Sequence, residues 1–483
     1  MDVGGSSTDR RPESDPGGRR RPKAAALLLA CGVAGIAPHT LAAGFRLLPA
    51  GLLAVVLGGH GLITVLRGVR SLGSGARGAV AGGCEPGPGS DADPPLPATS
   101  PVDVVVAARD EQAVIARLVE RVCSLRWPEG QLRLWVIDDG SEDRTPEVLA
   151  ELQAQHPQLQ VLRRPRDAGG GKSGALNLVL QELSGRWLLV LDADADLQAD
   201  TLERLVPFAE AGGWAAVQLR KAVVNASVNP LTQAQAMEMA FDALLQAGRL
   251  ARGGVGELRG NGQLLRRDAV LACGGFNEFT LTDDLDLSLR LVLAGQPVGV
   301  LWDPPVGEEA VLTLPALWRQ RQRWAEGGLQ RFLDHGFGFG GGSLSRYQAL
   351  DLLAFFLLQY VMPLLAAADL LGVLLTGTPP LMWPFSIVAL ASSALALVAG
   401  CRRAQEGPAL PTMTPFHVGL AILYLTHWFV VIPWVSVRMA LRPKRLVWAK
   451  TLHLGDDDEP LSAHDQPLAA DSEGELAAGG GQA

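Results

Sequence analysis

The stretch Trp187-Leu188-Leu189-Val190-Leu191-Asp192-Ala193-Asp194-Ala195-Asp196 joins a short apolar run to three alternating carboxylates. Residues 187–191 are typical of a strand that is buried on both faces of a parallel sheet. Three carboxylates at the end of such a strand are costly to bury unless a cation binds them. Mg²⁺ and Mn²⁺ suit this pattern, because they accept a few carboxylate oxygens and keep other positions for water and phosphate. We therefore predict a metal–diphosphate site at this strand end.

Alternating strand and helix patterns precede this stretch. Apolar runs at 102–107, 132–137 and 159–162 predict three further strands, and helical spacing of apolar residues between them predicts helices. This order predicts an α/β domain with a mostly parallel, Rossmann-like sheet and right-handed crossovers. Ligands bind such sheets at the carboxyl ends of the strands, where Asp138-Asp139 and Asp192 both lie.

The composition is too apolar for an ordinary soluble enzyme, with 48% hydrophobic and 19% charged residues among 483. Long apolar runs predict two membrane spans at about 24–43 and 47–66, and about three more at 351–376, 381–400 and 414–437. A signal peptide is the alternative for the first run, but the second run favours a helical hairpin. The net charge of −8 argues against a nucleic-acid partner. The five cysteines and eight histidines show no metal-binding spacing.

We predict six segments along the chain. They are a disordered N-terminus (1–22), two transmembrane helices (23–68), a linker (69–100), a cytoplasmic catalytic domain with an interfacial helix near its end (101–340), about three transmembrane or re-entrant helices (341–440), and a basic segment followed by a disordered acidic tail (441–483). Basic residues flank the first hairpin on both sides, so both of its ends should face the cytoplasm. Arg402-Arg403 and the basic run 438–450 should also face the cytoplasm by this rule. A single apolar run separates them, however, and one membrane crossing would place them on opposite sides. A re-entrant or interfacial C-terminal segment would resolve this conflict.

A glycine-rich loop, Gly169-Gly170-Gly171-Lys172-Ser173, precedes a predicted helix. It is not a Walker A motif, because the first required glycine would fall at Arg166. Its glycines nevertheless expose backbone N–H groups near a helix N-terminus, and Lys172 adds a positive charge. The loop is therefore a candidate diphosphate site, with a flexible surface loop as the alternative.

Thr282-Asp283-Asp284-Leu285-Asp286 begins another predicted helix, with Thr282 in the N-cap position. Carboxylates in a first turn commonly do no more than complement the helix dipole. Here they follow the loop Gly274-Gly275-Phe276-Asn277-Glu278, which is suited to close backbone approach. An ionised carboxylate at this place could accept a proton from an attacking hydroxyl.

Asp138-Asp139 and the run Gln320-Arg321-Gln322-Arg323-Trp324 each allow two interpretations. The aspartates could bind a ribose, a base edge or a metal-bound water, or they could form an Asx-type turn. The second run lies on a predicted helix, 315–333, whose Trp, Arg and Gln content is typical of a membrane surface. In the functional interpretation, Arg323 neutralises a leaving phosphate and Trp324 packs against a sugar or lipid.

Taken in chain order, these motifs resemble the membrane-bound family 2 glycosyltransferases with a GT-A fold, which include cellulose, chitin and hyaluronan synthases. The match covers about 101–335. The resemblance implies that Asp284 is the catalytic base and that Asp192 and Asp194 hold Mg²⁺ or Mn²⁺ with the diphosphate. It implies nucleotide or substrate contacts for the other matching residues: Glu111, Asp138, Asp139, Lys172, Asp283, Gln320, Arg323 and Trp324. Members often carry Pro-x-x-Asn-Glu after the first strand, and here only its glutamate, Glu111, is present.

Four stretches, at 169–177, 256–263, 282–290 and 323–328, resemble more closely the cyanobacterial monoglucosyldiacylglycerol synthases within this family. This resemblance implies inverting transfer of glucose from UDP-glucose to the free hydroxyl of 1,2-diacylglycerol at a lipid bilayer. A processive β-polysaccharide synthase is the alternative, but about five spans leave little material for a polymer channel. A membrane-anchored nucleotide-sugar scaffold without turnover is a third interpretation, which the full set of acidic groups disfavours.

Overall fold

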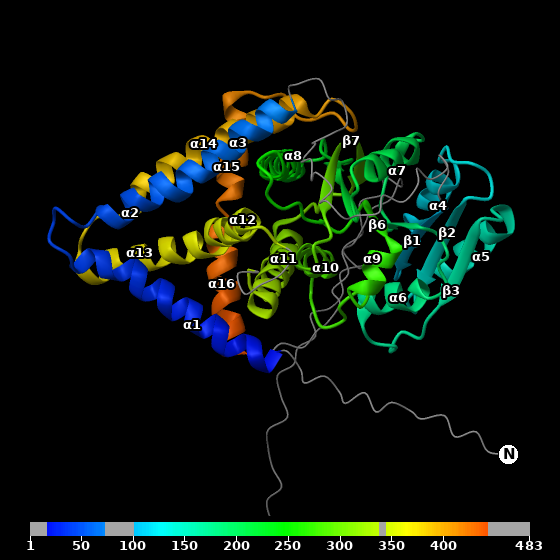
Figure 1. The fold of residues 1–483 in the computed structure, drawn as a ribbon, viewed down its shortest axis with the longest axis horizontal. Helices are drawn as coiled ribbons and strands as arrows, with labels where there is room; N and C mark the ends of the chain where they lie inside the picture. Colours follow the sequence, from blue (N-terminus) through cyan, green and yellow to red (C-terminus); the bar gives the residue numbers. More distant parts are fainter. Residues whose placement is uncertain (1–16, 73–100, 338–343, 443–483) are drawn as a thin grey trace, which may run out of the picture.

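The computed structural model describes residues 17–72, 101–337 and 344–442 (Figure 1). Most of the predicted N-terminal segment, linker and acidic tail lies outside these ranges. Helix α1 (Gly17–Ile36) begins before the predicted start of the first span at residue 23. Arg20 explains this difference, because its guanidinium pairs with Asp334 at 2.6 Å and donates to the carbonyl of Phe279 at 3.0 Å. The start of α1 is thereby attached to the α/β domain.

A seven-stranded sheet forms the centre of the α/β domain, in the order β3-β2-β1-β4-β6-β5-β7. Its strands are β1 (Val102–Ala108), β2 (Leu132–Asp138), β3 (Leu159–Arg163), β4 (Trp187–Leu191), β5 (Ala216–Val223), β6 (Gln263–Arg266) and β7 (Val298–Glu308). Neighbouring strands pair in parallel, except that β6 runs antiparallel to β4 and to β5. This confirms the predicted α/β class with a mostly parallel sheet. The last three strands were not predicted from the sequence.

Strand β4 illustrates why the sheet is buried on both faces. Because successive side chains alternate between faces, Trp187, Leu189 and Leu191 pack under α4 and α7, whereas Leu188 and Val190 pack against α6 and α10. All five side chains are buried, as expected for an apolar run without polar alternation. The acidic residues that follow the strand therefore lie at the carboxyl edge of the sheet.

The helices of this domain are α4 (Ile115–Cys123), α5 (Thr145–Gln155), α6 (Gly171–Leu180), α7 (Thr201–Ala211), α8 (Pro230–Leu250), α9 (Arg267–Ala272), α10 (Asp283–Leu293) and α11 (Leu314–His335).

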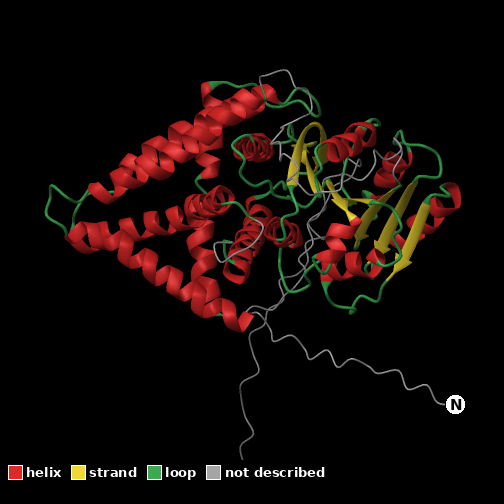
Figure 2. Ribbon diagram, viewed as in Figure 1, coloured by secondary structure: helices red, strands yellow, loops and turns green. Residues whose placement is uncertain are grey.

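Among the described residues, five helical stretches are long and apolar enough to cross a membrane. They are 18–40, 48–71, 346–376, 383–403 and 415–441. Their elements after α1 are η1 (Ala37–Thr40), α2 (Leu48–Leu53), η2 (Ala54–Gly58), α3 (Gly59–Ser71), α12 (Arg346–Phe356), η3 (Leu357–Val361), α13 (Met362–Thr376), α14 (Trp383–Arg403), α15 (Pro415–Leu425) and α16 (Trp428–Leu441). Figures 1 and 2 show α1 beside α13 and α3 beside α14, two pairs that diverge toward the α/β domain. Helices α15 and α16 lie at the wide end of this wedge.

Helix α11 differs in part from the interfacial helix that the sequence predicted. Leu314 and Trp318 near its start are exposed, as an interfacial helix would have them. From Arg321 onward the helix is largely buried between α10 and α16. The guanidinium groups of Arg321 and Arg331 are buried as well, because acidic side chains of neighbouring elements pair with them.

Candidate active site

The carboxylates after β4 are held in place by backbone and amide contacts. The backbone N–H of Asp192 donates to Oδ1 of Asn261 at 3.1 Å, and Oδ2 of Asp194 accepts from the N–H of Glu309 at 2.8 Å. Asn261 is fully buried and donates to the carbonyl of Gly307 at 3.3 Å. The ends of β4, β6 and β7 are thereby linked, which fixes both aspartates at one corner of the sheet.

Lys172 reaches this corner from the glycine-rich loop. Gly169, Gly170 and Gly171 all have positive φ angles, and a Cβ at Gly170 would lie 2.5 Å from Oε2 of Glu278. The loop therefore requires glycine and turns directly into α6. The Nζ atom of Lys172 lies 2.5 Å from Oδ1 of Asp192. Burial alone would raise the pKa of Asp192, but the Lys172 ammonium outweighs it and lowers this pKa below its ordinary value.

Asp283 and Asp284 lie in the first turn of α10, close enough for both to interact electrostatically with Lys172. Thr282 occupies the predicted N-cap position but makes no side-chain capping bond, and its buried hydroxyl packs against Gly327. Burial, together with the charge of Asp283, raises the pKa of Asp284 to about 6. A carboxylate with that pKa suits proton acceptance near neutral pH.

Asp286, two residues further along α10, has a different environment. It is buried and pairs with Arg290 at 2.7 Å and with His335 at 2.8 Å. It also accepts a hydrogen bond from Asn277 at 3.1 Å. These contacts occupy its oxygens, so Asp286 ties α10 to α11 and to the loop before α10.

The Gln320–Trp324 motif enters the site from α11. Its Trp324 ring lies 4.0 Å from the guanidinium of Arg321 and 5.5 Å from the ammonium of Lys221. Arg321 in turn lies 2.5 Å from Oε2 of Glu238. The positive charge of Arg323 helps to lower the pKa of Asp192, which brings this guanidinium into the same electrostatic environment. Arg321 was not predicted from the sequence, because nothing local distinguishes it from a solvated arginine.

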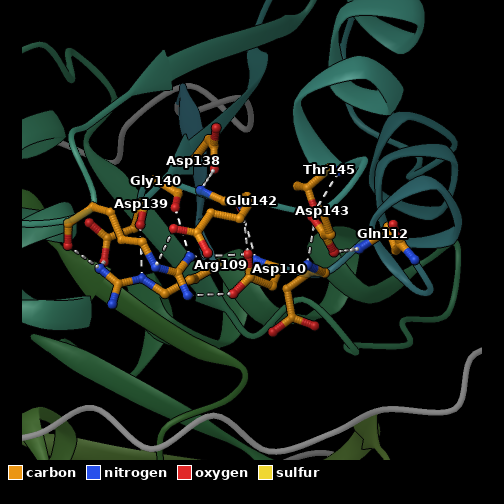
Figure 3. A network of polar contacts seen from close by, with 12 residues as sticks. Arg109, Asp110, Gln112, Asp138, Asp139, Gly140, Glu142, Asp143 and Thr145 are labelled. Atoms are coloured by element: carbon orange, nitrogen blue, oxygen red, sulfur yellow. Dashed lines mark hydrogen bonds and ion pairs between the residues drawn. The ribbon is translucent and has the colours of Figure 1, made fainter. Parts of the chain in front are cut away.

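The Asp138-Asp139 turn is a network of its own (Figure 3). Oδ1 of Asp138 accepts from the N–H of Ser141 at 2.9 Å, which is the Asx-type turn of the alternative interpretation. The carboxylate of Asp139 is buried and pairs with Arg109 at 2.6 Å and with Arg164 at 3.2 Å. Burial is the largest influence on the pKa of Asp139 and raises it, although both arginines oppose the shift.

A single cavity of about 1290 Å³ gathers most of the predicted site residues. Its walls include Glu111, Lys172, Asp192, Asp194, Asp283, Asp284, Gln320, Arg323 and Trp324. Asp138 and Asp139 do not line it, since Asp138 makes the turn and Asp139 pairs with two arginines; Arg109 and Arg166 do line it. Glu308 was also missed, since β7 was not predicted. It lines the cavity, pairs with Lys221 at 2.5 Å, and its pKa is raised by burial.

The acidic corner fits a cation that binds together with phosphate. Within residues 17–72, 101–337 and 344–442, no group of three or more His, Cys, Asp or Glu side chains is placed to hold a metal by itself. Mg²⁺ and Mn²⁺ do not need such a group, because one or two carboxylates plus substrate phosphates commonly hold them. Asp192 and Asp194 could supply that donor set, and the ammonium of Lys172 lies beside it.

Comparison with known proteins places this geometry in a family. Residues 97–327 match the description "Glycosyltransferase like family 2". The chain is 45% identical over 366 residues to β-monoglucosyldiacylglycerol synthase from Synechocystis sp., which covers 74% of this chain and 76% of that protein. The chain belongs to glycosyltransferase family 2. The synthase of the same name from Trichormus variabilis is 44% identical over 361 residues. That alignment covers 74% of this chain and 77% of that protein.

A solved structure confirms the fold class of this family 2 glycosyltransferase. A mannosyltransferase from Pyrobaculum calidifontis, in complex with GDP-Man and Mn²⁺, matches with a TM-score of 0.52 at 19% identity. The match covers 86% of this chain and 99% of that one. The chain is therefore a glycosyltransferase whose GT-A domain lies between apolar helices at both ends.

Proposed function

We propose that the enzyme transfers glucose from UDP-glucose to the free hydroxyl of 1,2-diacylglycerol, with inversion, to give β-monoglucosyldiacylglycerol. The observation that carries this proposal is the 45% identity to a synthase of that name over about three quarters of both chains. The cavity supports it, because its acidic groups open directly onto side chains from four of the five long apolar helical stretches. A charged donor and an apolar acceptor can therefore meet in one place.

In this proposal, Asp192 and Asp194 hold Mg²⁺ or Mn²⁺ together with the donor diphosphate. The cation supplies charge neutralisation as UDP departs. Lys172, at the N-terminus of α6, and Arg323, on α11, add positive charge on the diphosphate side. Gln320 and Trp324 bound the space next to it, where the sugar and the acceptor meet. Glu111, Asp138 and Asp139 lie at or behind the nucleotide end, so Arg109 is a further candidate for contact with the nucleotide.

Asp284 accepts the proton in the transfer step. The acceptor oxygen forms a bond to C1 of glucose while the bond from C1 to the diphosphate oxygen breaks, and UDP leaves with that electron pair. The proton of the acceptor hydroxyl passes to Asp284, whose raised pKa makes it a stronger base than an ordinary aspartate. Attack from the face opposite UDP converts an α-linked donor into a β-linked product.

We also propose that the apolar stretches embed the enzyme in a membrane, the first two as a spanning hairpin and the last three as spanning or re-entrant helices, and that the α/β domain faces the cytoplasm. Arg20 and Lys23 lie at one end of the first hairpin, and Arg67 and Arg70 at the other. Both ends reach the α/β domain, since Arg20 pairs with Asp334 and α3 packs on α8. This arrangement satisfies the preference of basic residues for the cytoplasmic side.

Purified enzyme, incubated with UDP-[¹⁴C]glucose, Mg²⁺ and diacylglycerol in detergent micelles, should form one labelled, chloroform-soluble product. A β-glucosidase, but not an α-glucosidase, should release the label as glucose. Label retained in a water-insoluble or high-mass polymer would instead support the polysaccharide synthase alternative. Omission of diacylglycerol is the control and should abolish the chloroform-soluble label.

The value of kcat/KM should depend on pH through Asp284. Because the base acts in its deprotonated form, kcat/KM should rise by about tenfold per pH unit below pH 6 and level off above it. Measurement of initial rates between about pH 5 and 8, at subsaturating diacylglycerol and with a check that the enzyme stays folded, tests this. A flat profile across that range would exclude Asp284 as the titrating base.

A further inference from the structure

The cavity extends beyond the acidic groups into the apolar helices. In this part, which we call the membrane arm, its walls include Gly58, Gly61, Ala366, Ala389, Ser393 and Ile432. These residues come from four of the five long helical stretches, and every cavity-lining residue that those stretches contribute is uncharged. In Figure 1 the same helices enclose the wedge that opens toward the α/β domain. The membrane arm is therefore an apolar continuation of the site where transfer takes place.

Helix α14 runs along the membrane arm and provides a scale for its length. The C-terminal half of α14 packs on the α/β domain, since a Cβ at Gly400 would lie 2.5 Å from the carbonyl oxygen of Ala240 on α8. Its first residues lie at the remote end of the wedge. Ser393 and Met382 both line the cavity, and an α-helical rise places them about 16 Å apart. That length suits a chain of many methylene groups better than a sugar.

Both π-helical turns of the described residues contribute to the wall of this cavity. The turn η2 supplies Leu57 and Gly58, and the turn η3 supplies Leu358 and Gln359. A π turn inserts an extra residue into a helix and frequently occurs at functional sites. Two such turns in different helices that face the same cavity indicate that its shape is built for a ligand.

Polar atoms on the wall of the arm favour a ligand that carries polar groups beside its hydrocarbon. The hydroxyl oxygen of Ser392 is buried and finds no hydrogen-bond partner among the described residues. The side-chain oxygen of Gln359 is likewise buried without a hydrogen-bond partner among the described residues. Such groups are costly to leave unpaired next to alkyl chains. The Ser392 hydroxyl can donate to an ester carbonyl, whereas the Gln359 oxygen can accept a hydrogen bond from a hydroxyl.

We propose that the membrane arm binds the acyl chains of the lipid acceptor and that its α14 wall at Ala389 and Ser393 determines which chain lengths are used. This inference rests on the proposed transfer to diacylglycerol. The arm places the chains along α14 and leaves the free hydroxyl at the acidic end, next to Asp284. Leu390 and Phe429, which also line the arm, are 52% and 48% exposed, so a lipid can enter from the side between α14 and α16.

Substitution of Ala389 by Phe should shorten the arm. We expect kcat/KM for diacylglycerol with eighteen-carbon chains to fall by about tenfold, the loss that follows when about two methylene groups per molecule are no longer buried. The value for eight-carbon chains should change by less than about threefold, because shorter chains end before the added ring. Ser393→Phe, nearer the acidic end, should impair both acceptors. The KM for UDP-glucose should stay the same in both variants.

Ile387→Phe is the matched control. Ile387 lies on the same helix, is 57% exposed and does not line the cavity, so its substitution should leave both chain-length values unchanged. Equal losses for both acceptors in Ala389→Phe, or no loss for either, would overturn the inference while the transfer reaction itself stands. If the wild-type enzyme glucosylates no diacylglycerol at all, the proposed function fails first.

A second measurement does not depend on the folding of any variant. Wild-type enzyme is irradiated with diacylglycerol that carries a diazirine at the end of one acyl chain, and the labelled peptides are identified by mass spectrometry. We expect label on residues 382–393, reduced by excess unlabelled diacylglycerol. Label confined to outward-facing residues such as Leu374, or label that unlabelled lipid does not reduce, contradicts an acyl-chain site.

Discussion

Asp284→Asn should lower kcat by about 10²- to 10⁴-fold, the usual contribution of a positioned general base. The amide has nearly the same shape as the carboxylate but cannot accept the proton of the acceptor hydroxyl. Binding of UDP-glucose should be almost unchanged, because the donor groups Asp192, Lys172 and Arg323 are untouched. Single-turnover rates and UDP-glucose affinity, measured on the same preparation, check both parts.

Asp283→Asn is the control for this substitution, since it makes the same chemical change one residue earlier. The charge of Asp283 helps to raise the pKa of Asp284, so its removal should move the acidic limb of the pH profile to lower pH. Substantial activity should remain. If Asp284→Asn instead abolishes UDP-glucose binding while Asp283→Asn abolishes turnover, the two roles have been assigned the wrong way round.

How far the sequence predicts this site depends on whether each residue carries a local signal. Asp192, Asp194 and Lys172 follow patterns that can be read without a structure: an acidic run after an apolar strand, and glycines before a helix. In the structure Lys172 contacts Asp192, and all three residues line one cavity. Asp138 and Asp139 carry an equally clear signal, yet they form a turn beside the cavity. An acidic pair at a strand end does not reveal whether its oxygens contact a ligand or other groups of the protein, such as the Ser141 N–H and the guanidinium of Arg109 here.

The site residues that the sequence did not reveal come from strands without a regular pattern of apolar residues. Strand β5 contains Arg220 and Lys221, and β7 contains Asp303-Pro304 and ends at Glu308, so neither shows an uninterrupted apolar run. Their charges are stabilised only by partners distant in sequence, such as Lys221 with Glu308 and Arg220 with Asp303 at 2.8 Å. The burial of α11 from Arg321 onward depends on the same kind of distant partner. The arginines of this helix indicate a surface position when their acidic partners are not known.

Glu257→Gln should strongly destabilise the fold. Glu257 is 1% exposed, and its carboxylate lies 3.0 Å from Arg331, 3.2 Å from Arg249 and 3.0 Å from Arg259. Removal of its charge leaves three guanidinium groups, two of them buried, with one carboxylate fewer. Breaking a buried pair by loss of one partner typically costs about 3–5 kcal/mol. Thermal unfolding in detergent should therefore shift down by several degrees.

The pH dependence of this loss identifies its cause. Burial would raise the pKa of Glu257, but the three arginines outweigh it and lower the pKa to about 2. A lowered pKa stabilises the fold fully above the ordinary value of 4.5 and progressively less as the pH falls toward about 2. The difference between wild type and Glu257→Gln should therefore be constant near neutral pH and shrink below about pH 4.5. Glu151→Gln, on the exposed face of α5, should shift unfolding by less than about 0.5 kcal/mol at every pH. If the difference in unfolding free energy between wild type and Glu257→Gln persists at low pH, the glutamine destabilises the fold by disturbing its packing. The charge of Glu257 would then not be what holds α8, α11 and the loop before β6 together.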